Sequence, residues 1–460
     1  MYAETYEILK THLRKGNKFT YKRNNNLLPF TTNKTQRVTF DNGSLPIMGA
    51  FSRLACNKKV KGITDENISE DILNNEYFEV ESGDEYYAKL LVEEYLGGEQ
   101  LNILHPKLFL YLPLSEGPVA GGEIKIAEFI KNIFFHNINL DDFYSENNSK
   151  FNSNILIEFI VDNLKDLPNE KNLSEFYMPS TLNKVVSVFE EDINFLLKNH
   201  EEFLVKNFDK IISFYLFFYF IQFTLKASSS VVSEELEKTF YLLDWETVSK
   251  NRKSVKFGYK NVSEYLKSLL TRIDGIEHMN ILLGQNNLLP AEMIQYFESL
   301  SESDKKEFIK YFKLWINYLR SEEDLDSQVL PNDFADLLHF YFESIEESYK
   351  SKKTRQGPIS RYPKPIEDLG KKYFLKRRGR FGYMFNMNQE MLILITALCV
   401  KKDKMKITQL FKEYERRGLF FDRDSLDNIV DLFNKLNLID KKSDSGDIQY
   451  VKSILWLFKK

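Results

Sequence analysis

A run of 15 residues near the middle of the chain, Ile211 to Leu225, limits the possible folds more than any other feature. It contains seven aromatic residues and no charged one. Such a segment belongs in a protein core or in a membrane, because its apolar surface is unfavourable in water. The run is shorter than the ~20 residues that span a bilayer, and Ser213, Gln222 and Thr224 interrupt it. We therefore predict a buried core helix and no membrane association.

Composition indicates a folded, helix-rich protein of more than one domain. The chain has 460 residues, with 38 Phe and 25 Tyr against 19 Gly and 12 Pro, which favours helices packed through aromatic side chains. Two cysteines, Cys56 and Cys399, are too few for a disulfide framework or a structural zinc site. The first residues lack the pattern of a signal peptide. We expect a cytoplasmic protein.

Four regions differ in pattern along the chain. Residues 1–125 combine turn signals, short strand-like segments and the loop Glu116–Gly122, and they predict a mixed α/β domain. Residues 126–350 repeat apolar positions every three or four residues, which predicts a helical middle domain. Residues 351–380 are basic and contain several Pro and Gly, as in a linker, and residues 381–460 predict a winged-helix-like domain. The expected fold class is mainly α with a smaller α/β N-terminal region, multi-domain, ending in a winged-helix-like α+β domain.

The C-terminal prediction depends on the order of its elements. Apolar periodicity predicts helices over 388–400, 407–417 and 425–436. Two strand-like segments, Leu438–Asp440 and Ile448–Val451, flank the polar turn Ser443–Asp447 as a hairpin. Three helices followed by a hairpin is the layout of a winged helix, in which the third helix would be the recognition helix.

The charge of that third helix argues against DNA reading. A helix in the major groove presents basic or amide side chains, because phosphates repel carboxylates. Here a protein-binding wing is favoured, while direct DNA reading and purely structural packing stay open as alternatives. The acids are Asp422, Asp424, Asp427 and Asp431 against Arg423 and Lys435, and the residues expected to face inward are Ile429, Val430, Leu432, Phe433 and Leu436.

The basic stretch before this domain is a better electrostatic candidate. Residues 351–380 contain 11 Lys and Arg against Glu367 and Asp368, with Tyr373 and Phe374 interleaved. Such a run can follow a phosphate backbone without sequence selectivity. Two alternatives are a solvated linker and a docking surface for the acidic residues 65–100. The candidate DNA-backbone residues are Lys371, Lys372, Lys376, Arg377, Arg378 and Arg380.

Signals for catalysis are weak. The six histidines lie at least 31 residues apart, so no metal-binding histidine pair exists in the sequence. Glu123 and Lys125 form an ExK pair of the kind that binds a metal in some nucleases, but the pattern is common by chance. Asp244 and Glu246 end an apolar segment, yet no GxxxxGK[ST] loop accompanies them. We predict no catalytic residue, no cofactor and no metal; Asp444 and Asp447 indicate a turn rather than a cation site.

Several segments resemble the DptG family, the G component of the bacterial DNA phosphorothioation-dependent restriction (Dpt/Dnd) system. The resemblance implies a defence role against phage, in which DNA lacking the sulfur mark is attacked and partner subunits supply ATPase and nuclease or helicase-like activity. It assigns no catalytic residue to this chain. The segments are Leu27–Thr32, Tyr215–Gln222, Leu243–Glu246, Arg416–Ser425 and 443–451.

These inferences lead to one main hypothesis and two rivals. The main one is a non-catalytic restriction subunit that bridges its ATPase and nuclease partners and contacts the backbone of double-stranded DNA. The first rival is a metal-dependent nuclease subunit that uses Glu123 and Lys125 with a distant Asp on unmodified DNA. The second rival is a regulator that reads DNA with its winged helix.

Overall fold

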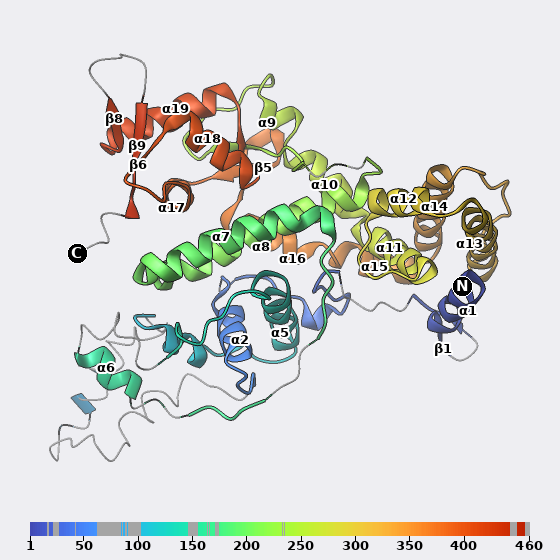
Figure 1. Ribbon diagram of the computed structural model, residues 1–460, viewed down its shortest axis with the longest axis horizontal. Helices are drawn as coiled ribbons and strands as arrows, with labels where there is room; N and C mark the ends of the chain where they lie inside the picture. The colour runs from blue at the N-terminus through green and yellow to red at the C-terminus, as the bar shows by residue number, and fades with distance from the viewer. Residues whose placement is uncertain are drawn as a thin grey trace.

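The structure is a computed structural model in which two long helices cross the middle of the molecule, α7 (Asn183–Asn199) and α8 (Glu201–Ser228) (Figure 1). The C-terminal elements lie on one side of this pair and α2 and α5 on the other, with α11 to α14 and α1 at the end of the molecule. Helices make up most of it, and the larger sheets involve its C-terminal part. The described residues are 1–15, 18–21, 27–41, 43–61, 84, 86–87, 90, 103–145, 155–162, 164, 166–170, 174–231, 233, 235–441 and 449–455.

Helix α8 contains the apolar run and confirms the predicted core helix. It is the one described helix long and apolar enough to cross a membrane, but 89% of that apolar window is buried in the protein. Two of the polar residues that interrupt the run, Ser213 and Gln222, are hydrogen-bonded inside the protein. Ser213 Oγ donates to Ser44 Oγ (3.0 Å), and the Gln222 amide exchanges two 2.9 Å hydrogen bonds with the backbone of Glu237. Internal partners remove the cost of burying these polar groups.

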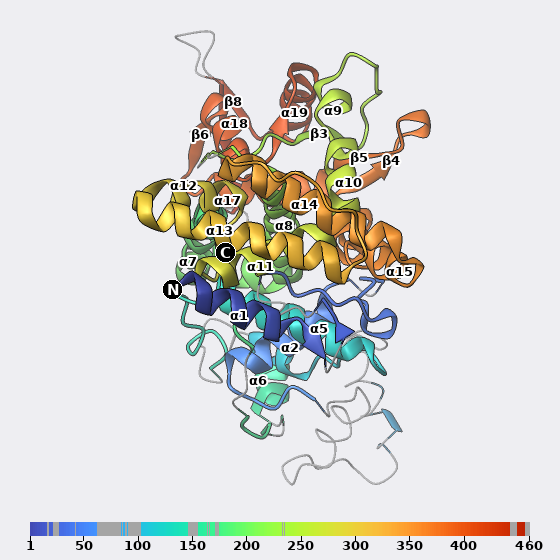
Figure 2. The same cartoon turned by 90° about the vertical axis from the view of Figure 1, so that its right-hand side faces the viewer.

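The helices after α8 form a bundle that the N-terminal helix α1 (Tyr2–His12) completes. Figure 2 shows α1 beside α11 and α13, and the Tyr2 and Phe308 rings meet edge to face at 5.2 Å. Inside the bundle, Trp315 Nε1 donates to the Tyr341 hydroxyl (2.9 Å). The bundle helices are α10 (Tyr259–Lys267), α11 (Leu269–Leu283), α12 (Pro290–Ser299), α13 (Glu302–Glu322) and α14 (Phe334–Ser351).

The described parts of residues 1–125 are mainly helical. Their described strands are β1 (Arg14–Lys15) and β2 (Lys18–Phe19), two residues each, beside α2 (Leu45–Ala55), the 3₁₀ helices Lys34–Gln36 and Pro106–Tyr111, and the start of α5 (Val119–Phe129). The expected loop Glu116–Gly122 partly belongs to α5. Gly122 allows α5 to approach its neighbour, because a Cβ there would lie 2.1 Å from the Gln36 carbonyl oxygen. A glycine that suggested a turn therefore serves close packing.

Beyond α5 the N-terminal half contains a π-helical turn, Ile130–Phe134, which continues α5 directly. Helix α6 (Ile155–Asp162) follows, and a 3₁₀ turn, Ser180–Leu182, leads into α7. An isolated bridge joins Lys58 to Asn169. In Figure 1 these elements lie on the side of α7 and α8 that faces away from the C-terminal part, with α6 at the edge of the molecule.

A four-stranded sheet connects the middle of the chain to its C-terminal part, with the strand order β4-β5-β3-β7. Strand β3 runs parallel to both neighbours, with Leu242 opposite Asn386 and Phe240 opposite Phe420. The carboxyl ends of β3, β5 and β7 therefore meet at one edge. The strands are β3 (Phe240–Leu243), β4 (Leu375–Arg377), β5 (Tyr383–Met387) and β7 (Phe420–Phe421), and the short helix α9 (Lys253–Lys256) lies beside β3.

The stretch predicted as a linker, 351–380, is regular structure in the protein. It forms α15 (Lys353–Arg361), α16 (Lys364–Tyr373), β4 and the 3₁₀ turn Gly379–Phe381. Its Pro and Gly suggested a linker, but Pro365 lies in the first turn of α16, where its missing N–H costs nothing. Gly370 allows Leu375 and Phe217 to pack closely against the helix. Ile366, Leu369 and Phe374 are fully buried.

The C-terminal part confirms the three predicted helices: α17 (Gln389–Cys399), α18 (Ile407–Arg416) and α19 (Arg423–Lys435). Asn388 and Asp422 cap α17 and α19 through their side chains. Strands β8 (Ile439–Lys441) and β9 (Gln449–Lys452) pair antiparallel as predicted, and β6 (Lys404–Lys406) pairs with β9, which gives the order β6-β9-β8. Leu436 was expected to face inward but is 38% exposed. The Ser443–Asp447 turn lies outside the described residues.

A buried ion pair holds the C-terminal part against the central helices. The carboxylate of Asp192 on α7 accepts two hydrogen bonds from the Arg417 guanidinium, at 2.7 and 2.9 Å, and both side chains are fully buried. Tyr215 on α8 also donates to Asp192 (2.5 Å). Gly418, with φ at +73°, follows Arg417, and a Cβ there would lie 2.3 Å from the Phe218 ring. An ion pair and close backbone packing therefore hold the C-terminal part against α7 and α8 at the same place.

Candidate nucleic-acid interface

The six candidate DNA-backbone residues occupy a corner where α16 ends and β4 begins. Lys371 and Lys372 lie in the last turn of α16, Lys376 and Arg377 lie in β4, and Arg378 and Arg380 belong to the turn that leads to β5. Gly379 and Gly382 adopt positive φ angles, +53° and +71°, which favour glycine and allow the tight reversal. We call the exposed members Lys371, Lys372, Lys376, Arg377 and Arg380 the basic corner.

Arg378 differs from the others because its guanidinium is bound inside the protein. It donates to the carbonyl oxygens of Leu243 (2.8 Å), Asp244 and Glu246 (both 3.3 Å), and to Asn386 Oδ1 (2.6 Å). These acceptors lie at the carboxyl end of β3 and on β5. In this conformation Arg378 fastens β4 to the end of β3 and has no guanidinium edge directed at a phosphate.

Two of the exposed lysines have nearby acceptors. Lys376 Nζ lies 3.0 Å from Asp244 Oδ1, and Lys372 Nζ donates to the Asp41 carbonyl oxygen (2.9 Å). Both pairs are exposed, so their net stabilisation is small, on the order of 0–1 kcal/mol. These contacts orient the two ammonium groups and leave them accessible to an anion.

Arg377 and Arg380 carry the least compensated charge of the corner, and Lys371 has only long contacts to acids. Lys371 Nζ stands 3.8 Å from both Glu367 and Asp368, which is the outer limit of an ion pair. Arg377 and Arg380 are exposed, and no described carboxylate lies within ion-pair distance of either guanidinium. The Arg380 guanidinium lies 5.0 Å from the centre of the Phe381 ring.

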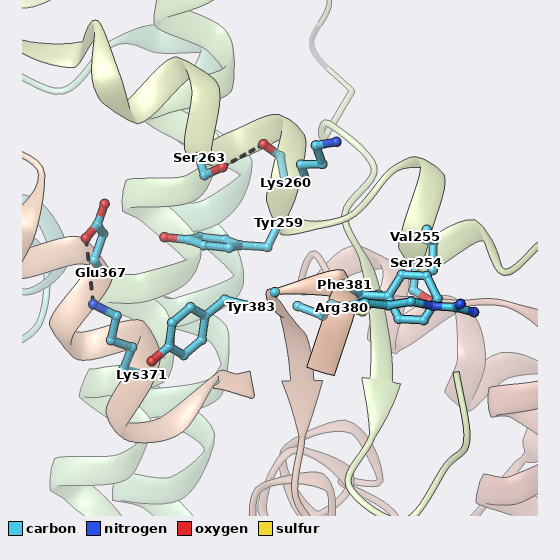
Figure 3. Close-up of a pocket in the computed structure, with 12 residues that line it drawn as sticks. Ser254, Val255, Tyr259, Lys260, Ser263, Glu367, Lys371, Arg380, Phe381 and Tyr383 are labelled. Atoms are coloured by element: carbon cyan, nitrogen blue, oxygen red, sulfur yellow. Dashed lines mark hydrogen bonds and ion pairs between the residues drawn. The ribbon is translucent and has the colours of Figure 1, made fainter. Parts of the chain in front are cut away.

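A hollow of about 570 Å³ opens beside the basic corner, between α9, α10, α16 and the β4–β5 hairpin (Figure 3). Figure 3 shows the Tyr259 and Tyr383 rings near Lys371 and the Arg380 side chain alongside Phe381. The hollow therefore combines cationic and aromatic groups. Its lining includes Ser254, Tyr259, Lys260, Lys371, Arg380, Phe381 and Tyr383.

Sequence reasoning missed the part of this hollow that α9 and α10 supply. Lys253, Lys256 and Lys260 follow one another at spacings of three and four, and this helical spacing of basic residues is the sequence pattern that could have indicated them.

A second hollow, of about 440 Å³, lies on another side of Lys371 and includes Arg37 and Asp368. Burial raises the pKa of Asp368 above its usual value.

The acids that follow β3 and β7 form a buried cluster instead of a metal site. The Arg252 guanidinium donates to Asp422 Oδ1 and Glu246 Oε2 (both 2.6 Å) and to Ser425 Oγ (2.7 Å). Burial opposes the ionisation of Asp422, but its bonds to Arg252 and to the Ser425 backbone hold the pKa of Asp422 below its usual value. We call Glu246, Arg252, Asp422 and Ser425 the arginine junction. It joins the carboxyl ends of two parallel strands.

The nuclease-like pair does not assemble a site in the described structure. Glu123 is buried on α5, and its carboxylate accepts from the Ser115 hydroxyl (2.5 Å) and backbone N–H (2.9 Å). Residues two apart on a helix point to different faces, so Lys125 does not converge with Glu123. Among the described residues, no three His, Cys, Asp or Glu side chains are grouped as a metal would require.

Several described segments that carry the family resemblance contact one another. Phe30 of the first segment lies against Phe220 of the second, with ring centres 4.9 Å apart. Arg417 reaches Tyr215 through Asp192, and Glu246 meets Ser425 in the arginine junction (3.0 Å). The resemblance therefore rests largely on residues that hold separate parts of the chain together. No family model matches the chain, and no curated protein matches its sequence well enough to count as a relative.

Proposed function

We propose that this chain is a non-catalytic, cytoplasmic subunit of a phosphorothioation-dependent DNA restriction complex. It bridges partner ATPase and nuclease or helicase-like subunits and contacts the backbone of double-stranded DNA without sequence selectivity. The observation that supports this best is the uncompensated charge of the basic corner, where Arg377 and Arg380 are exposed without an acidic partner among the described residues. Such cations gain affinity for a phosphate by releasing the counterions that surround DNA.

The C-terminal part serves as a protein-docking module in this proposal. Its element order is α17, β6, α18, the two-residue strand β7, α19, β8 and β9, and together with the sheet order β6-β9-β8 this supports the winged-helix interpretation. Helix α19 exposes Asp424, Asp427 and Asp431, which would be repelled by DNA phosphates and attracted to a basic protein surface. A mixed α/β unit within residues 1–125 remains part of the same proposal.

The DNA contact is tested by replacing Lys371, Arg377 and Arg380 together with Gln. The triple variant should bind duplex DNA more weakly, and its affinity should depend less on salt, because each lost phosphate contact removes about 0.9 from the slope of log K against log salt. Fluorescence anisotropy of a labelled duplex at several salt concentrations measures both quantities. We expect a slope shallower by about 2–3 units.

A matched control variant shows whether a loss of DNA affinity comes from the position of the replaced residues or only from the change in net charge. Lys184, Lys267 and Lys350 are exposed and lie outside the corner, so their replacement by Gln changes the net charge equally. This control should keep nearly the full affinity and slope. Equal losses in both triple variants, or no loss in either, would contradict a DNA contact at the basic corner.

The subunit role is tested by co-purification. The tagged chain, expressed with the ATPase and nuclease components of a restriction system of this type from the same source, should retain them through purification, as intact-complex mass analysis would detect. Failure to retain any of them would contradict the bridging role. Divalent-metal-dependent nicking of unmodified DNA by the isolated chain, abolished by Glu123→Ala, would establish the nuclease alternative instead.

A further inference from the structure

The hollow beside the basic corner contains features that a simple phosphate contact does not require. Its aromatic groups include Tyr383, which is 40% exposed, and Phe381, which lies beside Arg380 (Figure 3). Lys371 Nζ stands 5.4 Å from the centre of the Tyr383 ring. A duplex backbone needs cations but no open aromatic faces, because its bases are stacked inside the helix.

A buried hydroxyl supplies a second, independent sign of a ligand. Ser254 is 2% exposed and lines the hollow, and its Oγ has no hydrogen-bond partner among the described residues. Buried polar atoms are nearly always hydrogen-bonded, so an unpaired one beside a hollow indicates a missing polar partner. A ligand atom that donates to or accepts from this hydroxyl would supply it.

The arrangement of charge defines the class of ligand. Glu367 is held by Lys364 (2.8 Å) and lies 3.8 Å from Lys371, so its negative charge is compensated. Lys260 and Arg380 line the same hollow without a described acidic partner. The ligand should therefore combine an anionic group with a flat ring, as a nucleotide does. The volume of about 570 Å³ falls within the range of small-molecule pockets, roughly 300–1,000 Å³.

We propose that the hollow holds one unpaired nucleotide of a DNA strand, with its base against Tyr383 and its phosphate near Lys260, Lys371 and Arg380. This inference rests on the proposed function, because the duplex would be held by the basic corner, which shares Lys371 and Arg380 with the hollow. A DNA end with a single-stranded overhang, or a locally opened strand, supplies such a nucleotide. The chain then senses an unpaired position next to the duplex that it holds.

The test compares a blunt duplex with the same duplex carrying a short single-stranded overhang. The overhang should tighten binding to the wild-type chain, and Tyr383→Ala should remove most of that preference. Loss of base stacking predicts a decrease of roughly 5- to 100-fold in affinity for the overhang substrate. Tyr383→Phe retains the ring and should retain the preference.

Tyr265→Ala is the matched control, because Tyr265 is similarly exposed at 42% and lies on α10 but lines a different hollow. It should keep the wild-type ratio of overhang to blunt affinity. Equal binding of blunt and overhang duplexes by the wild-type chain, or an equal change in the ratio in Tyr265→Ala, would overturn the nucleotide site.

Failure of this inference can be told apart from failure of the proposed function. If blunt duplex binds with the expected salt slope while the overhang adds nothing, the basic corner stands and the nucleotide site is wrong. If neither substrate binds, both proposals are wrong. Saturable binding of free deoxynucleoside monophosphate without any overhang preference would assign the hollow to a free nucleotide and would also overturn the proposal.

Discussion

The arginine junction and the basic corner lie side by side in the protein, yet they use the same kind of charge in opposite ways. In the arginine junction, the buried guanidinium of Arg252 binds two carboxylates and a hydroxyl. Its charge is therefore neutralised inside the protein, where it holds two strands together. In the corner, Arg377 and Arg380 face solvent without a described acid nearby. The count of basic residues in a run therefore overstates the charge available to a partner.

Strand geometry explains how neighbouring residues divide between the two roles. Side chains alternate between the faces of a strand, so Lys376 and Arg378 point toward Asp244 while Arg377 points the other way. The acceptors at the end of β3 then fix Arg378. The residue next to it in sequence remains exposed.

The largest effect is expected when a buried arginine that pairs with a carboxylate is replaced, as at the Asp192–Arg417 ion pair. Arg417→Met should destabilise the protein toward the lower end of about 3–5 kcal/mol, because the buried Asp192 carboxylate loses its guanidinium partner and keeps only Lys401, 2.8 Å away, as a cation. Chemical denaturation monitored by circular dichroism measures the change. Arg416→Met is the control, because Arg416 is 42% exposed and pairs with Glu191 at the surface, where removal should cost less than about 1 kcal/mol. Equal effects in the two variants would show that burial does not decide the contribution of these arginines.

A second pair of variants compares the structural role of Arg378 with the proposed DNA-binding role of Arg377. Arg378→Gln should lower the free energy of unfolding by about 1–3 kcal/mol, because buried carbonyl groups at the end of β3 lose their donor. Arg377→Gln should change stability by less than about 0.5 kcal/mol and should weaken duplex binding instead. Parallel denaturation and anisotropy measurements test both variants. A stable Arg378→Gln protein with weakened DNA binding would place Arg378 in the interface.

The sequence predicted those parts of the fold in which local pattern and tertiary role agree. The charge-free run in α8 is too short to span a bilayer and so indicated a core helix, α17 is apolar on nearly all sides, and α18 and α19 show strong apolar periodicity. Residues 351–380 were different, because prolines and basic residues resemble a linker when read locally. Only the buried positions Ile366, Leu369 and Phe374 reveal that the segment packs against α8.

The candidate site was predictable only in the portion that is continuous in sequence. The run from Lys371 to Arg380 identified the basic corner, but it could not show which guanidinium was already bound. That depends on carbonyl groups from β3, which lie far away in the chain. The same limit applies to Ser254 and Lys260, which the fold alone brings beside Tyr383. Side chains that converge from separate elements leave no pattern in a single sequence.

The smallest expected effect is on the pH dependence of stability, and it comes from the surface ion pair of Glu191 and Arg416. This pair lies beside the buried ion pair of Asp192 and Arg417. Burial opposes the ionisation of Glu191, but hydrogen bonds from Arg416 and Lys401 lower the pKa of its carboxyl to about 2. A lowered pKa in the folded state means that the ionised form stabilises the fold above the usual value of 4.5, and that this contribution is lost as pH falls toward about 2. Glu191→Gln removes that carboxylate and should flatten stability against pH between these values. Because Glu191 is 45% exposed, the change should stay well below that of Arg417→Met. Thermal unfolding of both proteins across this acid range measures it, and identical pH profiles would show that the surface pair contributes nothing to the junction beneath it.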